Sequence, residues 1–225
     1  MQRLFKILTV ASMFALATCH ARAAVVINEI DADQTGNPDT MEFVELHGPA
    51  NALLDGLVLV FMNGANDSSY QAFDLDGWQT GPTGHFLLGN SAVTPTLDIV
   101  FPDATLHNGA DAVALYTGDA ADFPFGTPAT TTNLLDAIVY GTTHPDDTGL
   151  LTALGQSTQY EDTATTSISR VPEGMTGNFT NNTPPTPMHS GIPQLVPEPT
   201  SLFAILQLVA IAIATRKRRT PTSRR

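Results

Sequence analysis

The sequence predicts an all-β protein, an immunoglobulin-like β-sandwich, and three observations favour this fold class. Short apolar or alternating runs rich in Val, Ile, Phe and Leu recur at intervals of roughly ten to fifteen residues, which is typical of strands. Gly, Pro, Asn and Asp separate these runs, as turns require. No stretch of the central region keeps the apolar period of an amphipathic helix.

The central region offers nine candidate strands. The run at 57–62 is apolar at every position, so both faces of that strand should be covered, as inside a sandwich. Nine short strands fit an immunoglobulin-like arrangement of two sheets. The candidates are residues 25–30, 42–47, 57–62, 71–75, 85–88, 97–101, 112–116, 136–140 and 167–170.

The chain between the two ends is long enough for one domain with a substantial core. We expect the sandwich to occupy residues 24–174. Residues 175–195 are rich in Pro, Thr and Asn and have few apolar side chains, which predicts an extended stalk. Such a stalk would hold the domain away from a membrane.

The N-terminus has the pattern of a secretory signal peptide. Arg3 and Lys6 precede an apolar stretch at 7–17, and Ala21 and Ala23 frame an A-x-A cleavage site. We therefore expect residues 1–23 to form a short signal helix that signal peptidase removes, so that the protein is secreted. The alternative is a lipoprotein acylated at Cys19. Since Cys19 is the only cysteine, the mature chain has no disulfide and depends on its core.

The C-terminus has three features in series. Pro197, Glu198 and Pro199 precede an apolar run at 202–214 and a basic end at 216–225. A helix of that length covers roughly 20 Å of a hydrocarbon core of about 30 Å, which predicts a short, transient membrane anchor. The basic end should stay in the cytoplasm. An ordinary tail anchor is the alternative.

Together, these features resemble the PEP-CTERM sorting signal, over residues 196–225. The resemblance implies that an exosortase-like membrane enzyme processes the tail. It also implies a location in the cell envelope, with membrane anchoring before processing.

The charge distribution is one-sided. The chain carries 22 acidic residues, all but Glu198 between residues 24 and 174, whereas Arg170 is the only Lys or Arg in that span. A domain with a single base cannot neutralise phosphates, which excludes nucleic-acid binding and adhesion to anionic membranes. The partners that remain are divalent cations, extracellular polysaccharide and surface proteins.

A series of strand-and-turn motifs resembles the lamin-tail domain. The opening motifs are Val-Ile-Asn-Glu-Ile, Glu-Phe-Val-Glu-Leu and Leu-Asp-Gly-Leu-Val-Leu, and the later ones follow in the same order. The resemblance covers residues 25–170 and implies an immunoglobulin-like sandwich used as a binding or spacing module. Leu57 departs from the pattern, because the family usually has an aromatic residue there. The motifs lie at 26–30, 42–46, 54–59, 86–88, 108–115, 136–141 and 167–170.

An acidic segment at 31–42 has the ligand spacing of a Ca²⁺ loop. Oxygen donors fall at the first, third, fifth, seventh, ninth and twelfth positions, with Gly36 at the sixth. Pro38 and the flanking strands depart from the helical version of such a loop. The alternative is a turn in which Asp and Asn side chains cap backbone N–H groups. The candidate calcium ligands are Asp31, Asp33, Thr35, Asn37, Asp39 and Glu42.

Other chemistry has weaker support. The histidines at 47, 85, 107, 144 and 189 show no HxH or HExxH spacing, so the sequence predicts no zinc site. Glu29, Glu42 and Glu45 could supply the carboxylate pair of a glycoside hydrolase, but Glu29 belongs to the first-strand motif. No nucleophile elbow or phosphate-binding loop is present in the sequence.

The sequence therefore predicts a non-catalytic, exported module of the cell surface or extracellular matrix, with Ca²⁺ as its expected stabilising ion. The first alternative is a carbohydrate- or protein-binding adhesin that uses loops such as residues 118–133. The second is a secreted hydrolase.

Overall fold

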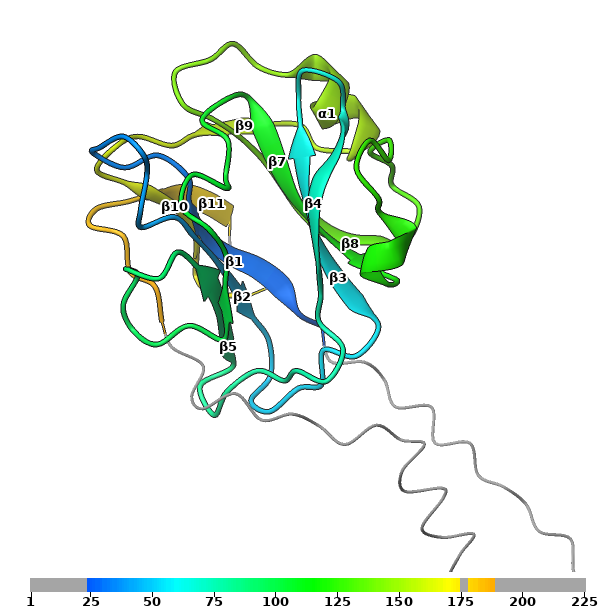
Figure 1. The fold of residues 1–225 in the computed structure, drawn as a ribbon, viewed down its shortest axis with the longest axis vertical. Coiled ribbons are helices and arrows are strands. Elements are labelled where there is room, and N and C mark those ends of the chain that lie inside the picture. Colours follow the sequence, from blue (N-terminus) through cyan, green and yellow to red (C-terminus); the bar gives the residue numbers. More distant parts are fainter. Residues whose placement is uncertain (1–23, 175–177, 189–225) are drawn as a thin grey trace, which may run out of the picture.

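The computed structural model describes residues 24–174 and 178–188, which form two packed β-sheets with very little helix (Figure 1). The six-stranded sheet has the order β11-β10-β1-β2-β5-β6, and the five-stranded sheet has the order β4-β3-β7-β8-β9. The prediction of an all-β fold is confirmed. The expected helices of the signal peptide and the membrane segment lie outside the described residues.

Each strand belongs wholly to one sheet. The six-stranded sheet contains β1 (Val26–Asp31), β2 (Phe43–His47), β5 (His85–Gly89), β6 (Ile99–Val100), β10 (Ser167–Val171) and β11 (Asn178–Asn182). The five-stranded sheet contains β3 (Leu57–Asn63), β4 (Ser68–Asp74), β7 (Asp111–Thr117), β8 (Leu134–Gly141) and β9 (Gln159–Glu161). A short 3-10 helix, η1 (Ala120–Asp122), and one turn and a half of α-helix, α1 (Thr148–Ala153), lie in the connections.

Strand pairing is antiparallel except at two edges. The pairs β5–β6 and β8–β9 are parallel, and the other neighbours in both sheets are antiparallel. Antiparallel pairing places side chains that are far apart in the sequence directly opposite each other. One such pair, between β2 and β5, forms the candidate site.

The main core lies between the two sheets. The side chains of Leu57, Leu59 and Phe61 on β3 face this space and pack against Ile27 and Leu46 of the opposite sheet. All five are fully buried. The alternation of inward side chains along each strand is what joins the sheets into one unit.

The five-stranded sheet has a second apolar layer on its outer face. Val58, Val60 and Met62 point there and are covered by Phe123 of the connection after β7 and by Leu150 of α1. Figure 1 shows α1 outside this sheet, away from the six-stranded one. The prediction that the strand at 57–62 is covered on both faces is confirmed.

All nine predicted strands are present, with small shifts at their ends, but the sequence did not indicate β9 or β11. β11 has the sequence Asn-Phe-Thr-Asn-Asn, which has no apolar alternation. Its strand conformation comes from pairing with β10 along its whole length. Tertiary hydrogen bonding, rather than local pattern, therefore defines this element.

Part of the segment expected to be a stalk belongs to the sandwich instead. Residues 178–182 form β11, and residues 183–188, here called the strap, run back across the sheet and bond to it. The strap is held because two buried carboxylates, on Glu29 and Glu45, accept hydrogen bonds from the backbone N–H groups of Thr186 and Met188. The sandwich thus extends to Met188, beyond the boundary at residue 174 that the Pro-rich composition had suggested.

Within the described ranges, no helix has the length and apolar character needed to cross a membrane. The candidate membrane segment at 202–214 is not part of those ranges.

Candidate functional site

Two histidines face each other on neighbouring strands of the six-stranded sheet. His47 ends β2 and His85 begins β5, and the antiparallel register makes them direct partners. Directly paired residues project from the same face, so the two rings meet with their centroids 4.7 Å apart. The close approach of the chain at this point needs a glycine: Gly84 has a φ of +90°, and a Cβ there would lie 2.2 Å from the carbonyl oxygen of Gly48.

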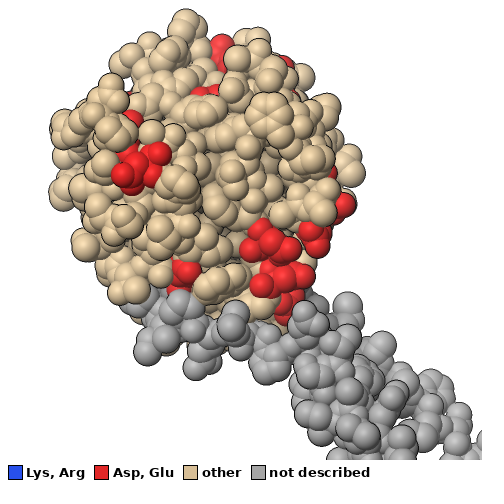
Figure 2. Space-filling model, in the orientation of Figure 1, with Lys and Arg blue, Asp and Glu red and all other residues tan. Residues whose placement is uncertain are grey.

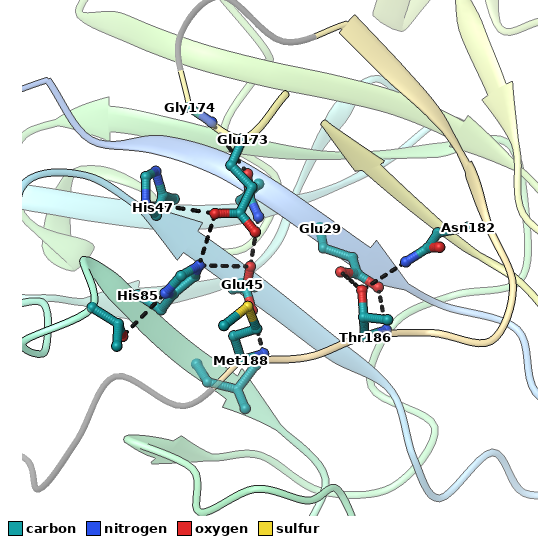
Figure 3. A network of polar contacts seen from close by, with 12 residues as sticks. Glu29, Glu45, His47, His85, Glu173, Gly174, Asn182, Thr186 and Met188 are labelled. Atoms are coloured by element: carbon teal, nitrogen blue, oxygen red, sulfur yellow. Dashed lines mark hydrogen bonds and ion pairs between the residues drawn. The ribbon is translucent and has the colours of Figure 1, made fainter. Parts of the chain in front are cut away.

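Glu173 joins the histidine pair from a distant part of the chain. It follows β10, and its Oε2 lies 3.5 Å from His85 Nε2 and 3.9 Å from His47 Nε2 (Figure 3). The three ligand atoms all lie within 4.8 Å of one another. In the ranges that the structure describes, this is the one place where three His, Asp or Glu side chains converge so closely.

A contact at ring nitrogen Nδ1 holds His85 in one orientation. Its Nδ1 lies 3.1 Å from the hydroxyl oxygen of Thr83, a hydrogen-bond distance. Its Nε2 is buried and makes no hydrogen bond, and the nearest oxygens are those of the Glu173 and Glu45 carboxylates. Burial and the neighbouring His47 lower the pKa of His85, so the ring favours the neutral form. Nε2 faces Glu173 and Glu45, and in the tautomer with the proton on Nδ1 its lone pair is available to a metal ion.

A second carboxylate lies beside the first. Glu45 is fully buried on β2, with its Oε1 at 3.9 Å from His85 Nε2. Asn28 Nδ2 donates to Oε1 at 2.6 Å, and the backbone N–H of Met188 donates to Oε2 at 2.5 Å. Burial raises the pKa of Glu45 to about 8. The site thus combines two imidazoles with two carboxylates, one buried and one half-exposed.

Glu29 binds the strap in the same way as Glu45. Its carboxylate accepts from the backbone N–H of Thr186 at 2.8 Å, from the Thr186 hydroxyl at 3.0 Å and from the Ser167 hydroxyl. A surface hollow of about 320 Å³ lies beside it, lined by Asn28, Glu173 and Thr186 among others. Glu29 and Glu45, two of the three carboxylates considered for glycoside hydrolysis, therefore both fasten the strap to the sheet.

The candidate calcium ligands of the segment at 31–42 bond to separate partners. Asp31, at the end of β1, accepts from Gln34 Nε2 at 2.7 Å, and burial raises its pKa to about 8. Glu42 instead accepts from the backbone N–H of Thr105 at 2.8 Å, and burial raises its pKa to about 7. The side chains at the two ends of the segment, Asp31 and Glu42, therefore bond to different partners.

The middle of the loop also has partners of its own. Asp39 accepts from Asn108 Nδ2 at 2.7 Å, and the backbone N–H of Asp33 donates to Asp162. Burial, and then the nearby Asp39, raise the pKa of Asp33. Thr35 and Asn37 are exposed. These contacts are of the kind expected for a turn that caps backbone N–H groups.

Calcium binding by the loop stays a prediction, and a titration tests it. Millimolar Ca²⁺ should raise the melting temperature of the protein, and Asp33→Ala and Glu42→Ala should each remove that rise. The shift is measured against Mg²⁺ at the same concentration. An unchanged melting temperature in Ca²⁺ would rule out this use of the loop.

The loop at 118–133, considered for adhesion, covers the outer face of the five-stranded sheet. Phe123 is buried there, whereas Phe125 is 82% exposed. The loop is thus mainly a cover, with one aromatic side chain presented to solvent.

Sequence reasoning missed the histidine site. No local spacing connects His47, His85 and Glu173, and their meeting follows only from the β2–β5 register and the course of the chain after β10. The signal-cleavage residues Ala21 and Ala23 and the sorting residues Pro197, Glu198 and Pro199 lie outside the described residues. Comparison of the chain with protein-family models, curated proteins and solved structures gave no match.

Proposed function

We propose that this protein is a non-catalytic, exported module of the cell surface or extracellular matrix. In this proposal, signal peptidase removes residues 1–23 and an exosortase-like enzyme processes a PEP-CTERM tail at 196–225. The sandwich is a lamin-tail-like, immunoglobulin-like domain that binds or spaces extracellular polysaccharide or surface proteins.

One geometric observation carries the proposal: the first strand of the sandwich and the strap both contact β2. Val26 is the cross-strand partner of His47, and the backbone N–H of Met188 bonds to Glu45, two residues away on β2. A tail that leaves from Met188 can therefore hold the sandwich by one end. The loop between β1 and β2, where Asp39 meets Asn108, lies at the other end of these strands from the pair of Val26 and His47.

The charge of the domain agrees with an extracellular role of this kind. Figure 2 shows several groups of acidic side chains, and no Lys or Arg among the residues coloured on the face in view. Arg170, the one base of the span 24–174, is engaged with Asp136 at 2.7 Å. A surface without bases favours cations, neutral glycans and proteins over polyanions.

Replacing Pro197, Glu198 and Pro199 together by alanine tests the sorting tail. The variant should accumulate in the membrane fraction of its own host at full length, because the processing enzyme no longer recognises it. Immunoblotting of membrane and extracellular fractions measures this, and Pro193→Ala, just outside the motif, is the matched control. Processing of the triple variant at the rate of the parent would contradict the proposal.

A further inference from the structure

We propose that His47, His85 and Glu173 bind one Zn²⁺ ion, which fastens the segment after β10 to the body of the sandwich. The donors are two imidazole nitrogens and one carboxylate oxygen, a combination that suits divalent transition metals and Zn²⁺ in particular. Water or the Glu45 carboxylate completes the coordination.

The spacing of the donors fits such an ion. Bonds of about 2.0–2.1 Å at tetrahedral angles separate neighbouring ligand atoms by about 3.3 Å. The carboxylate oxygen of Glu173 lies 3.5 Å from His85 Nε2 and 3.9 Å from His47 Nε2. All three ligand atoms lie within 4.8 Å of one another, so side-chain rotations can bring them onto one ion.

The buried nitrogen of His85 gives independent support. Its side chain is only 3% exposed, and Nε2 makes no hydrogen bond, although the carboxylates of Glu173 and Glu45 lie within ion-pair distance of it (Figure 3). A metal ion between these groups would give the buried nitrogen a direct bond in place of the hydrogen bond that it lacks. The contact of Nδ1 with Thr83 is the outer-shell hydrogen bond that orients metal-binding histidines.

The local charge also favours a cation. Two carboxylates approach the same ring nitrogen: Glu173 Oε2 lies 3.5 Å and Glu45 Oε1 lies 3.9 Å from His85 Nε2. The single base of the span 24–174, Arg170, is paired with Asp136 instead. A divalent ion at the three donors would offset the two carboxylates.

The placement of the donors gives the ion a structural role and a route of entry. His47 and His85 are on paired strands, whereas Glu173 precedes β11 and the strap. The Glu173 side chain is 48% exposed, so a hydrated ion can reach the site from that side. A bound ion would tie the C-terminal segment to β2 and β5.

Zinc titration of the full chain tests the proposal, in a Cys19→Ser background that removes the one thiol. Calorimetry should show one Zn²⁺ bound per chain. The melting temperature should rise by about 5–10 °C when free Zn²⁺ exceeds the dissociation constant about 100-fold. Glu173→Gln should weaken binding at least about 10-fold, and His85→Ala about 100-fold or more.

The controls separate loss of the site from loss of the fold. Glu173→Gln changes a half-exposed side chain, so its circular dichroism and metal-free melting temperature should match those of the parent. His107→Ala, which removes a histidine stacked on Tyr70 at 4.0 Å, should bind Zn²⁺ as the parent does. The proposal is overturned if the parent binds no Zn²⁺, or if Glu173→Gln and His47→Ala bind it as tightly as the parent.

Discussion

Replacing Arg170 by methionine is expected to lower the free energy of unfolding by about 3–5 kcal/mol, since it removes one partner of a largely buried ion pair. Arg170 on β10 and Asp136 on β8 belong to different sheets, and the guanidinium donates to both carboxylate oxygens, at 2.7 and 2.8 Å. The side chains are 11% and 14% exposed. Without the arginine, Asp136 is left as an uncompensated charge between the sheets.

The surroundings of the pair increase the expected loss. Arg170 Nε donates to the carbonyl oxygen of Ile27, whose own N–H donates to Asp136, and the guanidinium lies 4.0 Å from the centroid of the Phe179 ring. Burial raises the pKa of Asp136, and the arginine opposes that rise. One side chain thus connects β10 to β1, β8 and β11.

Urea unfolding of Arg170→Met against the parent measures the effect. The double variant Arg170→Met with Asp136→Asn is the matched control, because it leaves no unpaired charge and should recover part of the loss. A loss below about 1 kcal/mol in the single variant would show that the pair does not join the sheets energetically.

The protein should become less stable as the pH rises from about 5 to about 8 in the absence of divalent cations. Four carboxyl groups cause this, because burial raises their pKa values: Asp31 and Glu45 to about 8, and Glu42 and Asp162 to about 7. Between the ordinary and the raised pKa, the folded state binds a proton that the unfolded state does not. The stability is therefore full below the ordinary pKa and is lost as the pH rises through the folded pKa.

Each of these four carboxyl groups lowers the free energy of unfolding by up to about 1.4 kcal/mol per pH unit between its ordinary and its raised pKa. Urea titrations in EDTA at pH 5, 6.5 and 8 measure the slope. Asp31→Asn keeps an acceptor for Gln34 and should flatten it, whereas Asp103→Asn, at an exposed position, should not. A stability that is level or rises with pH over this range would contradict the prediction.

Much of the sandwich can be predicted from the sequence because its strands carry local signals. The six apolar residues at 57–62 indicate a strand covered on both faces, and the structure has it between the core and the layer under α1. β11 gives no such signal. Its Asn- and Thr-rich sequence forms a strand only because β10 offers it a partner, and the same composition suggested a stalk.

The candidate site is harder to predict because spacing along the chain does not determine where side chains point. The acidic segment at 31–42 has regular oxygen spacing, yet Asp31 and Glu42 reach separate hydrogen-bond partners. His47 and His85 show no motif, yet the register of two strands brings them together. Register depends on the whole sheet, which a local pattern does not contain.

The lengths of the outer strands of both sheets bear on whether one copy can pair with another. A long, unpaired edge strand is a template on which a second copy of a protein can build a continuous sheet. Here β6 has two residues and β9 has three, and the start of β4 is covered by hydrogen bonds from the loop at 124–129, whereas the fourth outer strand, β11, has five residues. Three of the four outer strands therefore offer a second copy little free backbone on which to extend the sheet.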